Sequence, residues 1–243
     1  MTKGDESKEA LAIAEIMIPI CKAGVTDKGV EVTSEAMQVH GGYGYCQEYP
    51  VEQMMRDSKI FAIYEGTNGI QSMDLTMRKI LMNPEQYNYS VLKKHIAETA
   101  GKAKGIVDEK YIEILERGVA KLDEVINMMK DQMAKGQFLL LFMNATPLQQ
   151  AMFMLCMAWA HLSSLAITQP KMKALVGDKK GEERDKLLKE NSEAAFYSGK
   201  VIASQFYLGA EFPKFFGKIE ALLFGEGAVI KASDPIFTGM LEQ

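Results

Sequence analysis

Apolar residues recur along most of the chain at intervals of three and four, the spacing that places them on one face of an α-helix. The clearest stripe consists of Ile112, Leu115, Val119, Leu122, Ile126, Met129 and Met133. A helix with such a stripe buries it against neighbouring helices. No segment alternates apolar and polar residues between turn signals, as a half-buried strand would. The pattern therefore predicts an all-α fold made of helical bundles.

Proline and glycine divide the first third of the chain into three predicted helices. Pro19 is expected in the first turn of a helix that runs to about Val39, because a proline there loses no needed hydrogen bond. Pro50 opens the second helix, which runs to about Ile63, and a third helix continues to about Met82. Glycine-rich junctions separate these three helices.

The character of the sequence changes at Asn83-Pro84, where the glycine-rich junctions end and plain amphipathic helices begin. We therefore expect one helical domain at 1–83 and a second helical bundle domain at 84–243. Within the second, the proline rule for a first helical turn predicts that an apolar helix begins at Thr146-Pro147.

Two further helices are expected near the C-terminal end. A long one should cover about 182–208, after a charged stretch at 178–190 that we interpret as a solvated turn and helix start. A short one should lie between Pro213 and Gly225, since proline and glycine mark helix boundaries.

The overall composition is that of an average globular protein. Hydrophobic residues make up 47% of the 243 positions, and 28 basic against 32 acidic residues give a net charge of -4. Without a basic patch, we expect no nucleic-acid partner. The three cysteines, Cys21, Cys46 and Cys156, have neither the spacing of a disulfide framework nor that of a zinc site. We therefore expect no metal and a reducing, cytoplasmic location.

No export signal or membrane span is expected either. The first ten residues are polar and lack the apolar stretch of a secretory signal. Leu148–Thr168 approaches transmembrane length, but Gln149, Gln150 and His161 interrupt it. A buried core helix is favoured, with membrane association as the weaker alternative.

The first glycine-rich junction runs Gln38-Val39-His40-Gly41-Gly42-Tyr43-Gly44-Tyr45. It follows a predicted helix, whereas a dinucleotide-binding glycine loop follows a strand, so we reject that interpretation. Glycines leave the backbone open to close approach by a ligand, here beside the amide of Gln38. From spacing alone, a tight turn between helices is the favoured interpretation.

The second junction runs Ile63-Tyr64-Glu65-Gly66-Thr67-Asn68-Gly69. Glu65 follows an apolar helix end and has no basic neighbour in sequence, a setting in which partial burial would raise its pKa and make it a general base. A helix-terminal glutamate that faces water is the alternative. Thr67 and Asn68 are both good N-caps for the next helix.

Taken together, the two junctions resemble the signature of the C-terminal helical domain of acyl-CoA dehydrogenases. The segment QVHGGYGYCQEYPVEQMMRDSKIFAIYEGTNGIQ, from Gln38 to Gln71, contains in order QxxGGxGY, EYPVE, MRD and IYEGT. The clear resemblance covers about residues 11–82. Residues after Pro84 resemble, less specifically, the extra helical domain of one branch of that family.

The resemblance implies a site and a reaction. It makes Glu65 the base that removes the α-proton of an acyl-CoA while FAD takes a hydride from the β-carbon, giving trans-2-enoyl-CoA. It assigns Gln38, Gly41 and Gly42 to the FAD of a neighbouring subunit and Thr67 to the adenosine part of FAD. It also implies an electron-transfer flavoprotein as electron acceptor and a homo-oligomeric enzyme.

The sequence departs from the family in two ways. Gly69 stands where several members have a glutamine that contacts the adenine end of FAD. The parts of the family that hold the flavin ring and most of the CoA have no counterpart in these 243 residues. We therefore expect the C-terminal part of a dehydrogenase that is inactive alone, the alternative being a non-catalytic helical module for self-association or partner binding.

Overall fold

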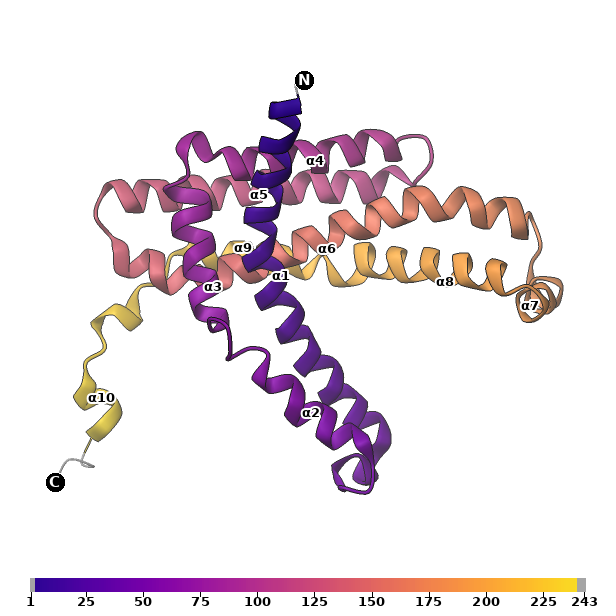
Figure 1. Ribbon diagram of the computed structural model, residues 1–243, viewed down its shortest axis with the longest axis horizontal. Helices are drawn as coiled ribbons and strands as arrows, with labels where there is room; N and C mark the ends of the chain where they lie inside the picture. The colour runs from indigo at the N-terminus through magenta and orange to yellow at the C-terminus, as the bar shows by residue number, and fades with distance from the viewer. Residues whose placement is uncertain (1–2, 240–243) are drawn as a thin grey trace.

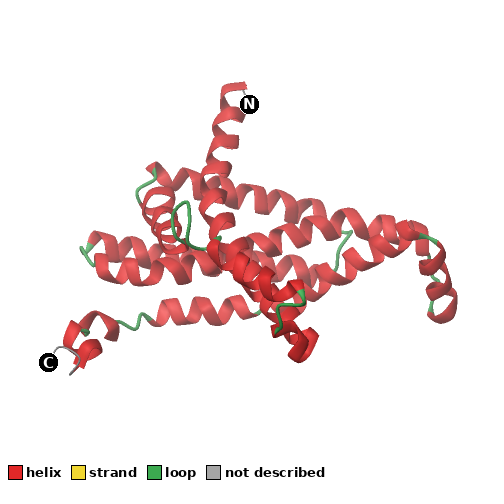
Figure 2. Ribbon diagram, turned by 60° about the horizontal axis from the view of Figure 1, so that its bottom comes forward, coloured by secondary structure: helices red, strands yellow, loops and turns green. Residues whose placement is uncertain are grey.

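The computed structural model describes residues 3–239, and within this range it contains helices and turns but no strand (Figure 2). The all-α prediction is confirmed. The principal helices are α1 (Lys3–His40), α2 (Pro50–Ile60), α3 (Asn68–Asp74), α4 (Tyr87–Ala103), α5 (Glu109–Ala134), α6 (Phe138–Val176), α7 (Gly181–Glu190), α8 (Ser192–Phe206), α9 (Lys214–Phe224) and α10 (Asp234–Thr238). Short 3₁₀ or π segments join them at Gly41–Tyr45, Leu75–Leu81, Pro84–Gln86, Tyr207–Glu211 and Ala228–Lys231.

Helix α1 crosses the remaining helices in the centre of the molecule (Figure 1). Its C-terminal half is accompanied by α2, which folds back along it, and α3 then returns to the bundle. Helices α4 and α5 form an antiparallel pair, and α6 runs past α1 to lie along α8. This arrangement places the first glycine-rich junction at the outer tip of the α1–α2 hairpin.

One hydrophobic core cluster joins these helices. The predicted α5 stripe faces it, with Ile112, Leu115 and Leu122 fully buried and Val119 partly so. The cluster also contains residues from both sides of the predicted boundary, Ile16, Ile20, Leu75 and Ile80 on one side and Leu92, Ile96, Leu148 and Met152 on the other. The division at 83/84 stays a prediction, and the two segments share buried apolar surface.

The expected helix start at Pro19 is wrong, because Pro19 lies in the interior of α1. A proline there removes a backbone N–H, which normally costs a helix about 3 kcal/mol. Ile16 and Ile20, on either side of Pro19, are fully buried against the bundle. Tertiary packing thus carries the helix through a residue that local sequence preference treats as a boundary.

The expected helix start at Thr146-Pro147 is wrong for the same reason. Helix α6 runs from Phe138 to Val176 and contains both Pro147 and Pro170. Leu141, Ala145 and Leu148 are buried on consecutive turns, so the core continues across the proline.

Helix α6 is also the one helix among the described residues that is long and apolar enough to cross a membrane. Half of its most apolar window, 50%, is buried inside the protein. Its contacts with α1, α4, α5 and α8 are those of a central packing helix. This burial favours the predicted core helix over a span.

The single helix expected over 182–208 is two helices. Asn191 interrupts it with extended backbone, and its side chain accepts a hydrogen bond from the Ala194 N–H at 3.0 Å. This is the capping interaction that starts α8. The short helix between Pro213 and Gly225 is confirmed as α9, and Gly225 ends it in the left-handed conformation.

The crossing of α1 and α6 depends on close contact between Gly24 and Phe153. A Cβ atom added to Gly24 would stand 2.1 Å from the Phe153 ring. Next to this contact, Gln149 Nε2 of α6 donates a hydrogen bond to the Ile20 carbonyl of α1 at 3.4 Å. The absence of a side chain at Gly24 therefore allows the two helices to approach.

We predict that Gly24→Ala lowers the free energy of unfolding by about 1–3 kcal/mol, because the added methyl overpacks the Phe153 ring. Gly101→Ala is the control, since a Cβ there meets nothing within 4 Å. It should be neutral or stabilising by up to about 1 kcal/mol. Chemical denaturation of both variants measures the difference, and equal stabilities would contradict the prediction.

Candidate functional site

The two glycine-rich junctions lie at opposite ends of α2 (Figure 1). This helix has 11 residues, which corresponds to a length of about 16 Å. Gln38, Gly41 and Gly42 therefore lie at one end, and Glu65 and Thr67 lie at the other. The five residues do not form one pocket within this chain.

The structure requires glycine at two of the three glycine positions of the first junction. Gly44 is required by packing, since its Cβ would lie 2.4 Å from the Met37 carbonyl oxygen. Gly41 has φ +62°, a conformation that favours glycine. Gly42 has neither constraint, because its φ is not positive and an added Cβ would meet nothing within 4 Å. The open backbone at Gly42 is thus available for close approach by a ligand.

A hollow of about 360 Å³ lies beside this junction. Its walls are Ser34, Met37, Gln38, Gly41, Tyr45 and Met55. Two of the predicted FAD-contacting residues, Gln38 and Gly41, therefore share one concave surface, and Gly42 follows Gly41 in the chain without lining it. Amide and backbone groups of this kind suit the polar, hydrogen-bonding part of a dinucleotide, so the residues present fit the cofactor that the sequence implies.

The turn that carries Glu65 has unusual backbone geometry. Glu65 has φ +52°, one of three non-glycine residues among the described positions with positive φ, and Gly66 follows at +85°. A glutamate in the left-handed region costs free energy that surrounding contacts must offset, and such outliers cluster at functional sites. The strained turn thus sets Glu65 apart from an ordinary helix-terminal glutamate.

The expectation that the helix end partly buries Glu65 is wrong for this chain. Glu65 is exposed, and its neighbours Tyr64 and Gly66 are exposed as well. Within residues 3–239, its carboxylate has no ion pair and its backbone N–H has no acceptor. Both groups are therefore available to a substrate, and no element among the described residues removes them from water.

Hydrogen bonds to α1, made by Lys22 and by Asn68 of the junction, hold this turn. Lys22 Nζ of α1 donates hydrogen bonds to the Gly66 carbonyl at 2.7 Å and to Asn68 Oδ1 at 2.9 Å. Asn68 Nδ2 donates to Asp27 Oδ1 at 2.7 Å and lies 2.9 Å from Thr26 Oγ1. The turn is thereby fixed to one face of α1.

Thr67 behaves as predicted for an N-cap. Its hydroxyl oxygen accepts a hydrogen bond from the Ile70 N–H at 3.2 Å at the start of α3. Gln71 Nε2 of the same helix donates to the Glu65 carbonyl at 3.3 Å. The role of Thr67 toward adenosine stays a prediction.

Sequence reasoning missed Lys22 and misassigned Asn68. We expected Asn68 to act as a cap, whereas its amide binds α1 residues 41 and 42 positions earlier. Lys22 lies 44 residues before the carbonyl that it contacts. No local pattern signals a contact over such a distance, so neither role could be found from spacing.

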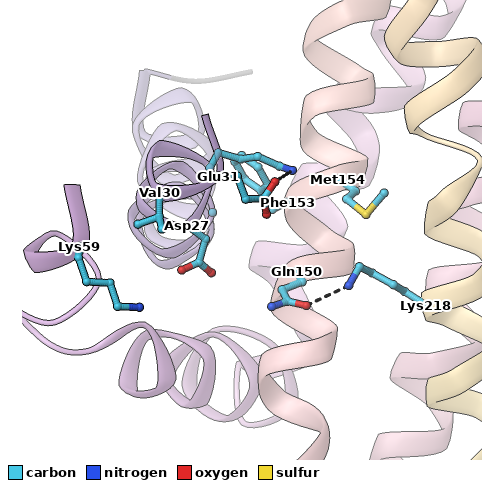
Figure 3. Close-up of a pocket in the computed structure, with 10 residues that line it drawn as sticks. Asp27, Val30, Glu31, Lys59, Gln150, Phe153, Met154 and Lys218 are labelled. Carbon is cyan, nitrogen blue, oxygen red and sulfur yellow. Dashed lines mark hydrogen bonds and ion pairs between the residues drawn. The ribbon is translucent and has the colours of Figure 1, made fainter. Parts of the chain in front are cut away.

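A second hollow, of about 430 Å³, lies where α1 faces α6 and α9 (Figure 3). Phe153 and Met154 of α6 contribute apolar surface to it, while Lys218 Nζ donates a hydrogen bond to Gln150 Oε1 at 3.0 Å. None of the five predicted site residues lines it. We therefore place the candidate site at the two junctions.

The structure offers no metal centre in the range that it describes, where no three metal-binding side chains come together. Cys21, Cys46 and Cys156 are free thiols in the structure. Burial raises the pKa of the Cys156 thiol to about 12, so this cysteine is inert at neutral pH.

Two families of known proteins match separate segments of this chain. Residues 3–80 match the family described as "Acyl-CoA dehydrogenase, C-terminal domain". Residues 92–233, more than half of the chain, match the family described as "Acetyl-CoA dehydrogenase C-terminal like". The chain therefore consists of two consecutive helical segments, and each matches a C-terminal domain of dehydrogenases. The chain belongs to the acyl-CoA dehydrogenase family.

Similar proteins carry names of the same family. Two proteins of Syntrophomonas wolfei, both named butyryl-CoA dehydrogenase, are 30% and 29% identical over 95% and 91% of this chain. These alignments cover 36% and 34% of the two relatives, so the chain spans about a third of their length. A short-chain-specific acyl-CoA dehydrogenase of Megasphaera elsdenii is 56% identical over 22% of this chain and 14% of its own length.

We predict that Asn68→Ala loosens the Glu65 turn. Removal of the amide breaks the contacts to Asp27 and Thr26 and takes one of two acceptors from Lys22, which should lower the free energy of unfolding by about 1–3 kcal/mol. Hydrogen exchange of the amides at 64–69 should accelerate. Asn127→Ala, at an exposed α5 position, is the control and should change neither quantity. Unchanged exchange in Asn68→Ala would contradict the assigned role.

Proposed function

We propose that this chain is the C-terminal part of an FAD-dependent acyl-CoA dehydrogenase in which Glu65 is the base for the α-proton of an acyl-CoA. The observation that carries the proposal is the Glu65 turn. An acidic side chain with positive φ and no partner in the described chain is held by Lys22 and Asn68 within the YEGT sequence. A structural glutamate at a helix end needs none of these features.

In the proposed reaction, the Glu65 carboxylate accepts the proton from the carbon next to the thioester carbonyl. The electron pair of that C–H bond forms the new carbon–carbon double bond as hydride leaves the β-carbon, and the product is trans-2-enoyl-CoA. FAD, when bound, accepts this hydride. The unpaired Glu65 N–H is suited to donate a hydrogen bond to the thioester oxygen, where negative charge develops.

The two glycine-rich junctions would contact different parts of bound FAD. We assign Gln38, Gly41 and Gly42 to the FAD of a neighbouring subunit and Thr67 to adenosine. The length of α2 supports this division, because the two sets are about 16 Å apart along its axis. The open backbone at Gly42 supports contact with a group from outside the chain.

The rest of the site would come from further polypeptide. The exposed Glu65 supports this, because a base that works in a water-excluded site needs a cover that the described part of the chain does not provide. A second support is an apolar stripe on α1, whose side chains are all more than half exposed, namely Leu11, Ile18, Val25, Val32 and Val39. Their spacing of seven residues is typical of a helix seam that packs against another helix.

Substrate, partner and location remain part of the proposal. Because the relatives aligned over most of this chain are named butyryl-CoA dehydrogenase, a short-chain acyl-CoA is the first substrate to test. We further propose an electron-transfer flavoprotein as the acceptor, a homo-oligomeric enzyme and a cytoplasmic location. The non-catalytic alternative is supported by the long helical extension after residue 84.

We predict that Glu65→Gln, in the complete enzyme that contains this C-terminal part, abolishes flavin reduction by butyryl-CoA. The amide keeps the shape of the side chain but cannot accept the α-proton, so the rate should fall by about 10² to 10⁴ or more. Binding of butyryl-CoA and flavin content should persist. Stopped-flow absorbance of the flavin measures the rate.

Glu52→Gln is the matched control on the neighbouring helix. Glu52 is paired with Arg56 at 2.8 Å, and that hydrogen bond lowers its pKa. This carboxylate already has a structural partner, so its loss should leave flavin reduction nearly unchanged. A fast Glu65→Gln enzyme together with a slow Glu52→Gln enzyme would refute the assignment of the base.

We also predict that the isolated chain binds FAD weakly or not at all and shows no acyl-CoA dehydrogenation. It has only peripheral contacts to FAD and nothing that positions a hydride acceptor at the β-carbon. The measurement is flavin absorbance after gel filtration with added FAD. Recovery of a yellow complex with one FAD per chain would contradict the prediction.

A further inference from the structure

The ammonium group of Lys22 is bound to neutral oxygen atoms of the Glu65 turn. It donates to the Gly66 carbonyl at 2.7 Å and to Asn68 Oδ1 at 2.9 Å. Neither acceptor is a carboxylate, and Lys22 is partly buried. Hydrogen bonds from a charged donor are roughly twice as strong as those between neutral groups. Lys22 therefore binds the turn more strongly than an uncharged polar side chain would.

The amide of Asn68 has only one favourable orientation beside Lys22. Its nitrogen donates to Asp27 Oδ1 at 2.7 Å and to the Ala23 carbonyl at 3.2 Å. A carboxylate and a carbonyl can only accept hydrogen bonds, whereas an ammonium group can only donate them. The amide oxygen must therefore face Lys22, and Asp27 keeps it in that orientation.

The strained backbone of the turn is stabilised by hydrogen bonds to its carbonyl groups. Glu65 has φ +52° and Gly66 has φ +85°. The Glu65 carbonyl accepts from Gln71 Nε2 at 3.3 Å, and the Gly66 carbonyl accepts from Lys22 at 2.7 Å. A return of Glu65 to negative φ would rotate both peptide groups and lose these bonds. Because the bond from Lys22 is shorter and charge-assisted, Lys22 offsets more of the strain than Gln71 does.

Lys22 holds the turn without occupying the groups that the proposed reaction uses. It binds one backbone carbonyl and one amide oxygen. Within residues 3–239, the Glu65 carboxylate has no ion pair and the Glu65 N–H has no acceptor. This geometry suits a residue that orients a catalytic base and leaves its reacting atoms free.

We propose that Lys22 is a positioning residue for Glu65, which acts through the Gly66 carbonyl and Asn68. The proposal rests on the proposed role of Glu65 as the base and adds the group that sets its conformation. Its structural part, that Lys22 holds the turn, concerns this chain alone and can be tested without cofactor or substrate.

Amide hydrogen exchange of the chain, followed by NMR, tests the structural part. Lys22→Met keeps an unbranched side chain but removes the donor. The Asn68 N–H, which donates to the Ala62 carbonyl at 3.1 Å, should then exchange at least about tenfold faster. The matched control is Lys79→Met, which removes an ion pair to Glu15 of α1 at 3.5 Å and should leave this rate unchanged.

Rapid kinetics of the complete enzyme test the catalytic part. At saturating butyryl-CoA, flavin reduction in Lys22→Met should be about 10²-fold slower than in the wild type, because a displacement of about 1 Å can cost that much. The butyryl-CoA concentration that gives half the maximal rate should change by less than about threefold, since Lys22 does not contact the substrate. Lys79→Met should keep both values.

An unchanged Asn68 exchange rate in Lys22→Met would overturn the structural part. Equal acceleration at the buried Leu122 amide of α5 would show general destabilisation and would overturn it as well. A fast Lys22→Met enzyme beside a slow Glu65→Gln enzyme would overturn the positioning role and leave the base in place. A fast Glu65→Gln enzyme would instead refute the proposed function, and the exchange experiment would still decide whether Lys22 holds the turn.

Discussion

The seating of α1 on α6 is the contact on which the other features of this chain depend. Gly24 lets the Phe153 ring approach the backbone of α1, and Gln149 adds a hydrogen bond one turn away. Lys22 and Ala23, immediately before Gly24, are also partners of the turn that carries Glu65. The same turn of α1 therefore contacts the helical extension on one side and the candidate catalytic loop on the other.

Through this arrangement, the helices after residue 84 help to position the candidate site. They contribute none of the five predicted site residues, yet α6 fixes the helix to which the Glu65 turn is bound. A second link is the hydrogen-bond contact of 3.0 Å between Ser72 of α3 and Thr146 of α6. Helix α6 is thus linked to the turn that carries Glu65 by a chain of only a few contacts.

The sequence was informative where the determinants are local. The α5 stripe, the start of α2 at Pro50 and the cap at Thr67 depend on neighbouring residues, and all three were predicted correctly. The helix starts expected at Pro19 and Pro147 were wrong, because burial of residues on both sides outweighs the local cost of proline. The exposure of Glu65 could not be predicted, since it depends on which distant segments cover the turn.

The hydrogen bond between Gln149 and Ile20 joins residues 129 positions apart. During synthesis of the chain, α1 leaves the ribosome long before α6 exists. At about 5–20 residues per second, the delay between them is on the order of 10 s. Throughout that interval α1 can pack only against the earlier helices α2, α3 and α4, and the part of its apolar surface that α6 covers stays exposed to water.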